Sequence, residues 1–118
     1  MVKDTAYQPD RGDFVYLDFN PQVGTEQSGR RPALVLSVRD FNIATGLMAV
    51  CPVTNTQTGS RFEVPVPRGA KLSGVVLSHQ FRTVDWIARA AAFHSKANDD
   101  LMHDVIGRID AILSLAGS

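Results

Sequence analysis

Cysteine is almost missing from this sequence, and residues that could bind a metal are sparse. Cys51 is the only cysteine, so no disulfide can form within the chain, and its apolar neighbours in LMAVCPV favour a small buried side chain over a reactive thiol. The three histidines, His79, His94 and His103, lie far apart and leave no zinc-binding spacing. A glycine-rich phosphate-binding loop is absent as well. We therefore expect a site that uses neither a metal ion nor a cofactor.

A long apolar run is missing too. No stretch approaches the roughly 18 consecutive apolar residues that a membrane span requires, and the first residues, MVKDTAYQPDRGD, contain no signal-peptide core. We expect a cytoplasmic protein with no membrane contact. The 118 residues are enough to bury a core, and we expect a single domain over 1–118.

The sequence has no excess of charge of either sign, because 12 Lys and Arg balance 12 Asp and Glu. The distribution of these charges is uneven. Residues 1–20 and 96–118 each carry a net charge of minus two, and the residues between them carry plus four. A locally basic middle can bind a polyanion even when the whole chain is neutral. Scattered, solvated surface charge is an equally good interpretation of the count alone.

Five segments have the apolar pattern of β-strands. Residues 14–19 alternate, with Val15, Leu17 and Phe19 on one face. Residues 32–38 form a nearly continuous apolar run, as expected for a strand that is covered on both sides. The other strands are predicted over 47–53, over 61–67, where two prolines favour a sheet edge, and over 74–86, a long segment that can bend.

Two segments predict helical structure. Residues 39–46 suit one helical turn closed by Gly46. Near the C-terminus Asn98 is a suitable N-cap, and the apolar residues after it recur at helical spacing: Leu101, Val105, Ile109, Ile112 and Leu113. The pattern predicts a mainly β (α+β) fold, in which an amphipathic C-terminal α-helix lies on a compact, strongly curved sheet.

Polar residues gather where the predicted strands end or are interrupted. They are Glu26 and Arg31 in the loop GTEQSGRR, Thr54 and Asn55 after the third strand, and Ser78, His79 and Gln80 within the fifth. Polar side chains inside a strand cost stability unless they are hydrogen-bonded or functional. The main candidates also have plain structural interpretations: a rim histidine for His79, a turn-capping hydroxyl for Thr54, and a loop ion pair for Glu26 and Arg31.

The same segments resemble the MazF/PemK family of toxin endoribonucleases from bacterial toxin–antitoxin pairs. The resemblance runs through RGDFVYLDFNPQVGTEQSGRRPALVLS, FNIATGLMAVCPVTNTQTG, FEVPV and SGVVLSHQFRTVDW, from about Arg11 to the final helix. Its most specific pattern is Glu-Gln, a glycine and Arg-Pro-Ala entering one strand, with Pro-x-Thr closing the next. The resemblance implies a small SH3-like barrel of the CcdB/PemK type, a homodimer, and metal-independent cleavage of single-stranded RNA at short sequences.

The resemblance also implies roles for particular residues. It assigns catalysis to Arg31 and Thr54, and also to Glu26. His79 stands where many relatives have an aspartate, and Leu77 stands where the PemK branch has an arginine, so Glu26 and His79 both remain candidates for the general base. We expect RNA contacts from Arg30, Gln27, Asn55, Arg61, Ser78, Gln80 and Arg82.

The chemistry can also be worked out from the residues themselves. RNA supplies its own nucleophile, the 2′-OH, so the protein needs a base for that proton, a cation for the developing charge and a donor for the phosphate. Glu26 or neutral His79 can act as the base. Arg31 is permanently charged and can bind two phosphate oxygens, and Thr54 can donate to a non-bridging oxygen.

Three functions fit the sequence. The first is a sequence-specific endoribonuclease toxin that a cognate antitoxin inhibits with an acidic segment, and that reaches DNA only through this antitoxin. The second is a non-catalytic toxin on the same barrel that, like CcdB, binds DNA gyrase. A gyrase-binding surface does not need Glu26, Arg31 and Thr54, so these residues favour the first function. The third is a binding module whose site is inactive.

Overall fold

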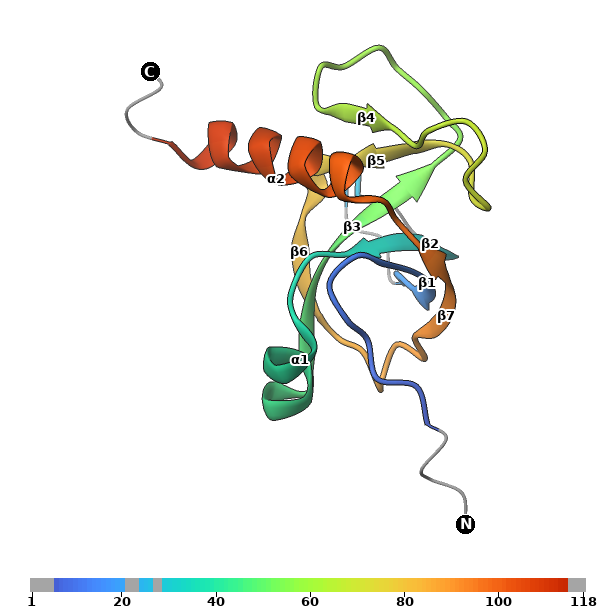
Figure 1. The fold of residues 1–118 in the computed structure, drawn as a ribbon, viewed down its shortest axis with the longest axis vertical. Coiled ribbons are helices and arrows are strands. Elements are labelled where there is room, and N and C mark those ends of the chain that lie inside the picture. Colours follow the sequence, from blue (N-terminus) through green and yellow to red (C-terminus); the bar gives the residue numbers. More distant parts are fainter. Residues whose placement is uncertain (1–5, 21–23, 27–28, 115–118) are drawn as a thin grey trace.

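The computed structural model describes residues 6–20, 24–26 and 29–114. One antiparallel seven-stranded sheet forms the body of the protein, and its strands lie in the order β4-β5-β3-β2-β1-β7, with β6 also paired to β3. The strands are β1 (Asp13–Asp18), β2 (Arg30–Val35), β3 (Leu47–Thr54), β4 (Glu63–Pro65), β5 (Val75–Leu77), β6 (Arg82–Asp85) and β7 (Ala92–Lys96). The remaining elements are α1 (Arg39–Thr45), α2 (Asp99–Leu113) and a 3-10 helix, η2 (Ser78–Gln80). The predicted mainly β class with a C-terminal helix is confirmed (Figure 1).

The central strands are buried on both faces because their side chains alternate between two apolar clusters. In β2, Leu34 packs into the cluster that α2 covers, whereas Ala33 and Val35 pack into a second cluster on the other face. All three are fully buried. The predicted alternation of 14–19 is confirmed as well, since Val15, Leu17 and Phe19 all belong to the second cluster.

Helix α2 begins where the sequence predicts. The Asn98 side chain accepts a hydrogen bond from the Leu101 N–H at 2.8 Å, as an N-cap should. Leu101 and Val105 are buried against the sheet. The predicted apolar face is wrong for the last turn: the helix runs out past the sheet (Figure 1), and Ile112 and Leu113 are 38% and 62% exposed. No helix in the described part of the chain is both long and apolar enough to cross a membrane.

The predicted fifth strand is broken in two by η2. The pairs Val53↔Val76 and Val50↔Arg82 are three residues apart along β3, but they are six residues apart along the facing chain, which runs from β5 to β6. Three residues therefore loop out of the ladder, and they form η2. The predicted bend is real, but it is a register shift rather than a continuous strand.

Two further differences concern the sheet edges. β7, which the sequence pattern does not predict, pairs with β1 and forms one edge. β4 forms the other edge, as its prolines predict, but it is shortened to Glu63–Pro65. The helical turn over 39–46 is confirmed as α1, which ends at Gly46 with a left-handed φ of 72°.

Candidate active site

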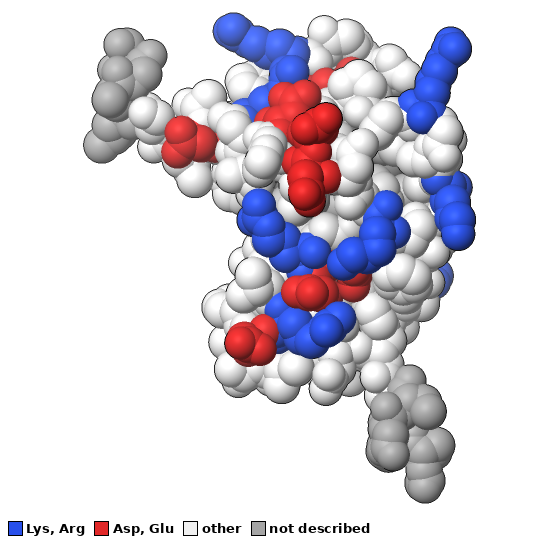
Figure 2. All heavy atoms as spheres, viewed as in Figure 1, with Lys and Arg blue, Asp and Glu red and all other residues white. Residues whose placement is uncertain are grey.

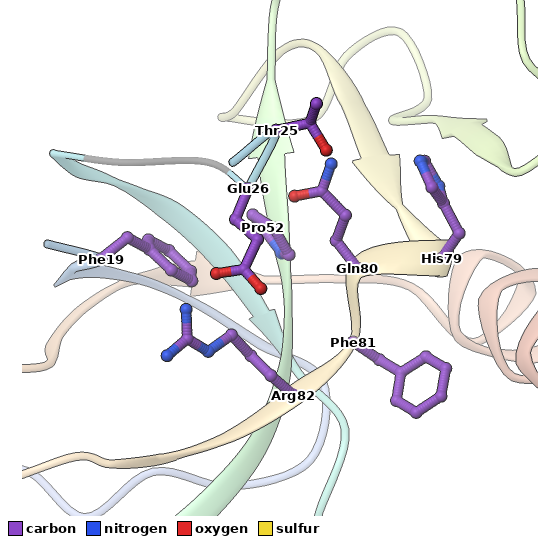
Figure 3. A pocket seen from close by; sticks show the side chains of 8 residues that line it. All are labelled: Phe19, Thr25, Glu26, Pro52, His79, Gln80, Phe81 and Arg82. Carbon is purple, nitrogen blue, oxygen red and sulfur yellow. The ribbon is translucent and has the colours of Figure 1, made fainter. Parts of the chain in front are cut away.

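A hollow lies beside η2, next to Phe19 of the second apolar cluster. Its volume is about 460 Å³, and it is lined by Phe19, Thr25, Glu26, Pro52, His79, Gln80, Phe81 and Arg82 (Figure 3). Phe19 continues the chain after β1, Thr25 and Glu26 belong to the loop between β1 and β2, Pro52 lies on β3, and the last four follow one another through η2 into β6. We call it the main hollow.

Glu26 and Arg82 place an acid and a cation at one side of the main hollow. In Figure 3 the Glu26 carboxylate is directed into the hollow, toward the side on which Arg82 and Phe19 lie. The Arg82 guanidinium carbon stands 5.9 Å from the centre of the Phe19 ring. Such a contact with an aromatic face helps to orient an arginine. Glu26 is exposed, so it can reach a substrate.

The polar triplet of η2 divides into exposed and buried members. His79 is exposed, and its ring centre lies 6.0 Å from that of Phe62. Figure 3 shows His79 at the far side of the main hollow from Glu26, with Gln80 between them. Ser78 is fully buried, and its hydroxyl donates to the Phe62 carbonyl at 2.6 Å. Ser78 therefore anchors η2, and its burial corrects the expectation that its side chain is available for RNA.

The sheet register brings Arg31 and Thr54 to one face. Ala33 of β2 pairs with Pro52 of β3, and Leu17 of β1 pairs with Arg31. Because side chains alternate along a strand, Arg31 shares the face of Ala33 and Thr54 shares the face of Pro52, although Thr54 itself pairs with Val75 of β5. Thr54 is 8% exposed, and its hydroxyl oxygen accepts from the Thr56 N–H at 3.1 Å. The turn-capping interpretation of Thr54 is thus confirmed, and the same hydroxyl still carries a hydrogen that it can donate.

Thr54 lines a second, smaller hollow of about 180 Å³, which we call the threonine hollow. It shares Thr25, His79 and Gln80 with the main hollow, so the two adjoin. The remaining lining residues are Thr54, Thr56, Thr58, Glu63 and Leu77.

Glu63 shapes the wall of the threonine hollow, a role that no motif in the sequence indicates. Its carboxylate accepts from the Thr58 N–H at 3.0 and 3.1 Å, from the Thr58 hydroxyl at 2.7 Å and from the Gly59 N–H at 3.1 Å. These bonds, that from the Thr58 hydroxyl first, lower the pKa of Glu63 below its ordinary value. Glu63 therefore ties the loop between β3 and β4 to the edge strand.

Other predicted RNA contacts lie apart from the main hollow. The Arg30 guanidinium donates to the Ala90 carbonyl at 2.8 Å, and as the strand neighbour of Arg31 it leaves the opposite face of β2. Arg61 lines a different hollow with Arg108, against α2. The Asn55 side chain accepts from the Ser73 hydroxyl at 3.2 Å. Gln27 lies outside the described residues. Within one chain, therefore, these residues do not form a single basic groove.

The visible surface charges also show no single basic groove on the face seen in Figure 2. On the face seen in Figure 2, acidic and basic side chains are interspersed, and acidic side chains gather near α2. The first turn of α2 carries Asp99 and Asp100. Among the residues that the structure describes, no group of three or more His, Cys, Asp and Glu side chains could hold a metal ion.

Comparison with known proteins identifies relatives over nearly the whole chain. Escherichia coli K12 "Endoribonuclease toxin MazF" is 44% identical over 87 residues, which cover 74% of this chain and 78% of that protein. "Endoribonuclease toxin ChpB" of the same strain is 38% identical over 118 residues, covering 96% of this chain and 99% of the relative.

Solved structures agree with this likeness. The crystal structure of MazF (Form-I) from Deinococcus radiodurans superposes with a TM-score of 0.88 at 46% identity, covering 92% of this chain and 98% of that one. A MazE–MazF structure (Form-II) from the same organism gives a TM-score of 0.82 at 41% identity, with the same coverage. The sequence profile described as "PemK-like, MazF-like toxin of type II toxin-antitoxin system" matches residues 10–113. Since this match spans most of the chain, the protein belongs to the PemK-like, MazF-like toxin family.

Proposed function

We propose that this protein is a sequence-specific endoribonuclease toxin of the cytoplasm, which cleaves single-stranded RNA without a metal ion. In this reaction the 2′-OH attacks the adjacent phosphorus, the bond to the departing 5′-oxygen breaks, and a 2′,3′-cyclic phosphate and a 5′-OH result. The curated relatives are named endoribonucleases, and the family is the one to which this chain belongs.

The observation that carries the proposal is the pair of adjoining hollows, which share His79 and bring Glu26, His79 and Thr54 together, with Arg31 on the strand face that continues from the pair Ala33↔Pro52. A phosphate at this point would meet a permanent cation and a hydroxyl donor. Arg31 stabilises the charge that develops on the phosphate oxygens. Thr54 donates to a non-bridging oxygen, and the Thr56 N–H holds its oxygen in position.

The proton of the 2′-OH requires a base, for which the main hollow offers Glu26 and His79. Glu26→Gln and His79→Gln distinguish them by the pH dependence of the single-turnover rate. Removing the base abolishes the acidic limb of the profile along with most of the rate, because general-base catalysis is worth roughly 100- to 10,000-fold. The variant that keeps both this limb and most of the rate identifies the residue that is not the base.

Two assemblies are part of the proposal. We infer that the protein is a homodimer, since one chain does not gather its arginines into a single groove. We also infer that a cognate antitoxin inhibits it through an acidic segment that folds on binding, and that DNA is reached only through this antitoxin. Support comes from the MazE–MazF structures of Deinococcus radiodurans, in which a similar chain is found with MazE.

The deciding experiment is incubation of the purified protein with a long single-stranded RNA in excess EDTA, followed by mapping of the new ends. We expect cuts at a short recurring sequence, with 5′-OH ends. A substrate with one 2′-deoxy residue at the cut site should remain intact. Cleavage of that substrate, or loss of cleavage in EDTA, would refute the mechanism, and an absence of any cleavage would favour a non-catalytic toxin that binds gyrase.

A further inference from the structure

The threonine hollow differs chemically from the main hollow. Four hydroxyl side chains, those of Thr25, Thr54, Thr56 and Thr58, line it together with the amide of Gln80. The described residues that line it include no lysine or arginine, and they do include the carboxylate of Glu63. A phosphate would gain no fixed cation here and would be repelled by Glu63.

An uncharged group with several donors and acceptors suits such a lining better. A nucleobase has this character, because its edges present amino, carbonyl and ring-nitrogen groups that hydroxyls and amides can pair with. The hollow is also lined by Thr54, the residue that the proposed function assigns to the phosphate. A base that enters it therefore belongs to a nucleotide next to the proposed scissile phosphate.

The wall that carries Thr56 and Thr58 belongs to an exposed loop, and such a loop must be ordered before it can discriminate between bases. Two contacts hold it. The Thr54 hydroxyl oxygen accepts a hydrogen bond from the Thr56 N–H. The Glu63 carboxylate accepts hydrogen bonds from the Thr58 N–H, the Thr58 hydroxyl and the Gly59 N–H. Glu63 itself is fixed by β4, where it pairs with Leu77, the residue before η2.

We propose that Glu63 is a positioning residue for base recognition: by holding the loop over 56–59, it shapes the threonine hollow to receive one nucleobase of the RNA. The inference rests on the proposed function, since it assigns a subsite of that same site. Glu63 touches no reacting atom. A change at Glu63 therefore alters mainly the preference for one base next to the cut, and only secondarily the rate of cleavage at the preferred sequence.

The test is NMR titration of the full-length protein with single-stranded oligonucleotides made entirely of 2′-deoxy residues, which the proposed reaction cannot cut. Four probes differ in the base at one position beside the central phosphate, and a fifth is abasic there. For the wild type we expect shifts of the Thr56, Thr58 and Gly59 amides that depend on this base, with affinities that differ by roughly tenfold. The abasic probe should leave these amides nearly unchanged.

Glu63→Gln keeps the size of the side chain but turns an NH₂ toward the Thr58 and Gly59 donors. We expect it to bind all four probes within about twofold of one another, with amide signals outside the loop unchanged. Asp40→Asn is the matched control, because Asp40 is an exposed acid on α1, and it should behave as the wild type does. If Glu63→Gln does not fold, Glu63→Asp, which keeps the charge but shortens the reach, takes its place.

Three results would overturn the inference. The first is an equal shift with the abasic probe, which would mean that the hollow binds the sugar-phosphate backbone rather than a base. The second is the absence of any shift of the loop amides. The third is a wild-type base preference in Glu63→Gln. The RNA cleavage assay is run in parallel on the same proteins. A wild type that binds these probes with base preference but cuts no RNA would refute the proposed function and leave this inference intact.

Discussion

Replacing Gly74 by alanine should displace Thr54 from the site. Gly74 directly precedes β5 and has a φ of +122°, and a Cβ built there would lie 2.6 Å from the Thr54 carbonyl oxygen and 3.2 Å from the Asn55 Oδ1. The first contact is with backbone, which cannot rotate away. Gly74→Ala therefore has to push apart β3 and the chain that pairs with it at Thr54.

The cost has two parts that a control can separate. A side chain at such a positive φ costs about 1–3 kcal/mol of backbone strain. The steric overlap adds about 1–3 kcal/mol, as overpacking does in cores. Gly69→Ala measures the strain alone, since Gly69 has a φ of +88° and nothing lies within 4 Å of its Cβ position.

Urea unfolding of both variants gives their free energies of unfolding. We expect Gly74→Ala to be less stable than Gly69→Ala by about 1–3 kcal/mol. Under conditions where both are folded, Gly74→Ala should also cut RNA about 100-fold more slowly in single-turnover assays, because shifts near 1 Å in a catalytic group have effects of that size. Unfolding free energies within about 0.5 kcal/mol of each other would refute the steric argument.

Four further outcomes follow from contacts described above. Arg31→Ala should abolish most cleavage at saturating protein, whereas Arg30→Ala, which loses a bond to the Ala90 carbonyl, should keep most of it; equal losses would contradict this division. Burial raises the pKa of Cys51 to about 12, so iodoacetamide should modify the urea-unfolded protein but not the native one, and rapid native modification would count against it. Ser78→Ala should lower the free energy of unfolding by about 1 kcal/mol, since the bond to the Phe62 carbonyl is lost; no change in urea unfolding would disprove this. Because the bonds to its carboxylate lower the pKa of Glu63, its stabilising effect is present above the ordinary glutamate pKa and is lost as the pH falls through the lowered one. Hydrogen exchange, corrected for its intrinsic pH dependence, should show constant protection of the Thr58 and Gly59 amides from about pH 5 to 8 and a loss only in stronger acid; a loss near neutral pH would oppose the assignment.

Much of the fold could be predicted because burial imposes a period on the sequence. Val15, Leu17 and Phe19 alternate because every second side chain along β1 and just past its end packs into the second apolar cluster. Asn98 marks the start of α2 because its side chain satisfies an N–H of the first turn. β7 escaped prediction for the opposite reason. As an edge strand it leaves Phe93 49% exposed and buries Ser95, so its apolar and polar residues carry no regular signal.

The candidate site can be named from the sequence in kind but not in arrangement. Chemistry and family resemblance nominate Glu26, Arg31 and Thr54, whereas only the folded structure shows that Glu26 and Thr54 line adjoining hollows. The burial of Ser78 could not be predicted, because a sequence does not distinguish a buried hydroxyl bonded to a carbonyl from an exposed one. Glu63 was missed because its partners, Thr58 and Gly59, are loop residues whose positions depend on how the loop folds back.

The register shift at η2 has a consequence for how this protein can evolve. Because η2 consists of three residues that the ladder does not use, and because the buried Ser78 hydroxyl ties it to the Phe62 carbonyl, the exposed position beside Ser78 can change its chemistry without disturbing strand pairing. His79 occupies that position. The strand ladder thus places no demand on this site-facing residue, and new substrate preferences can arise there by single substitutions that leave strand pairing intact.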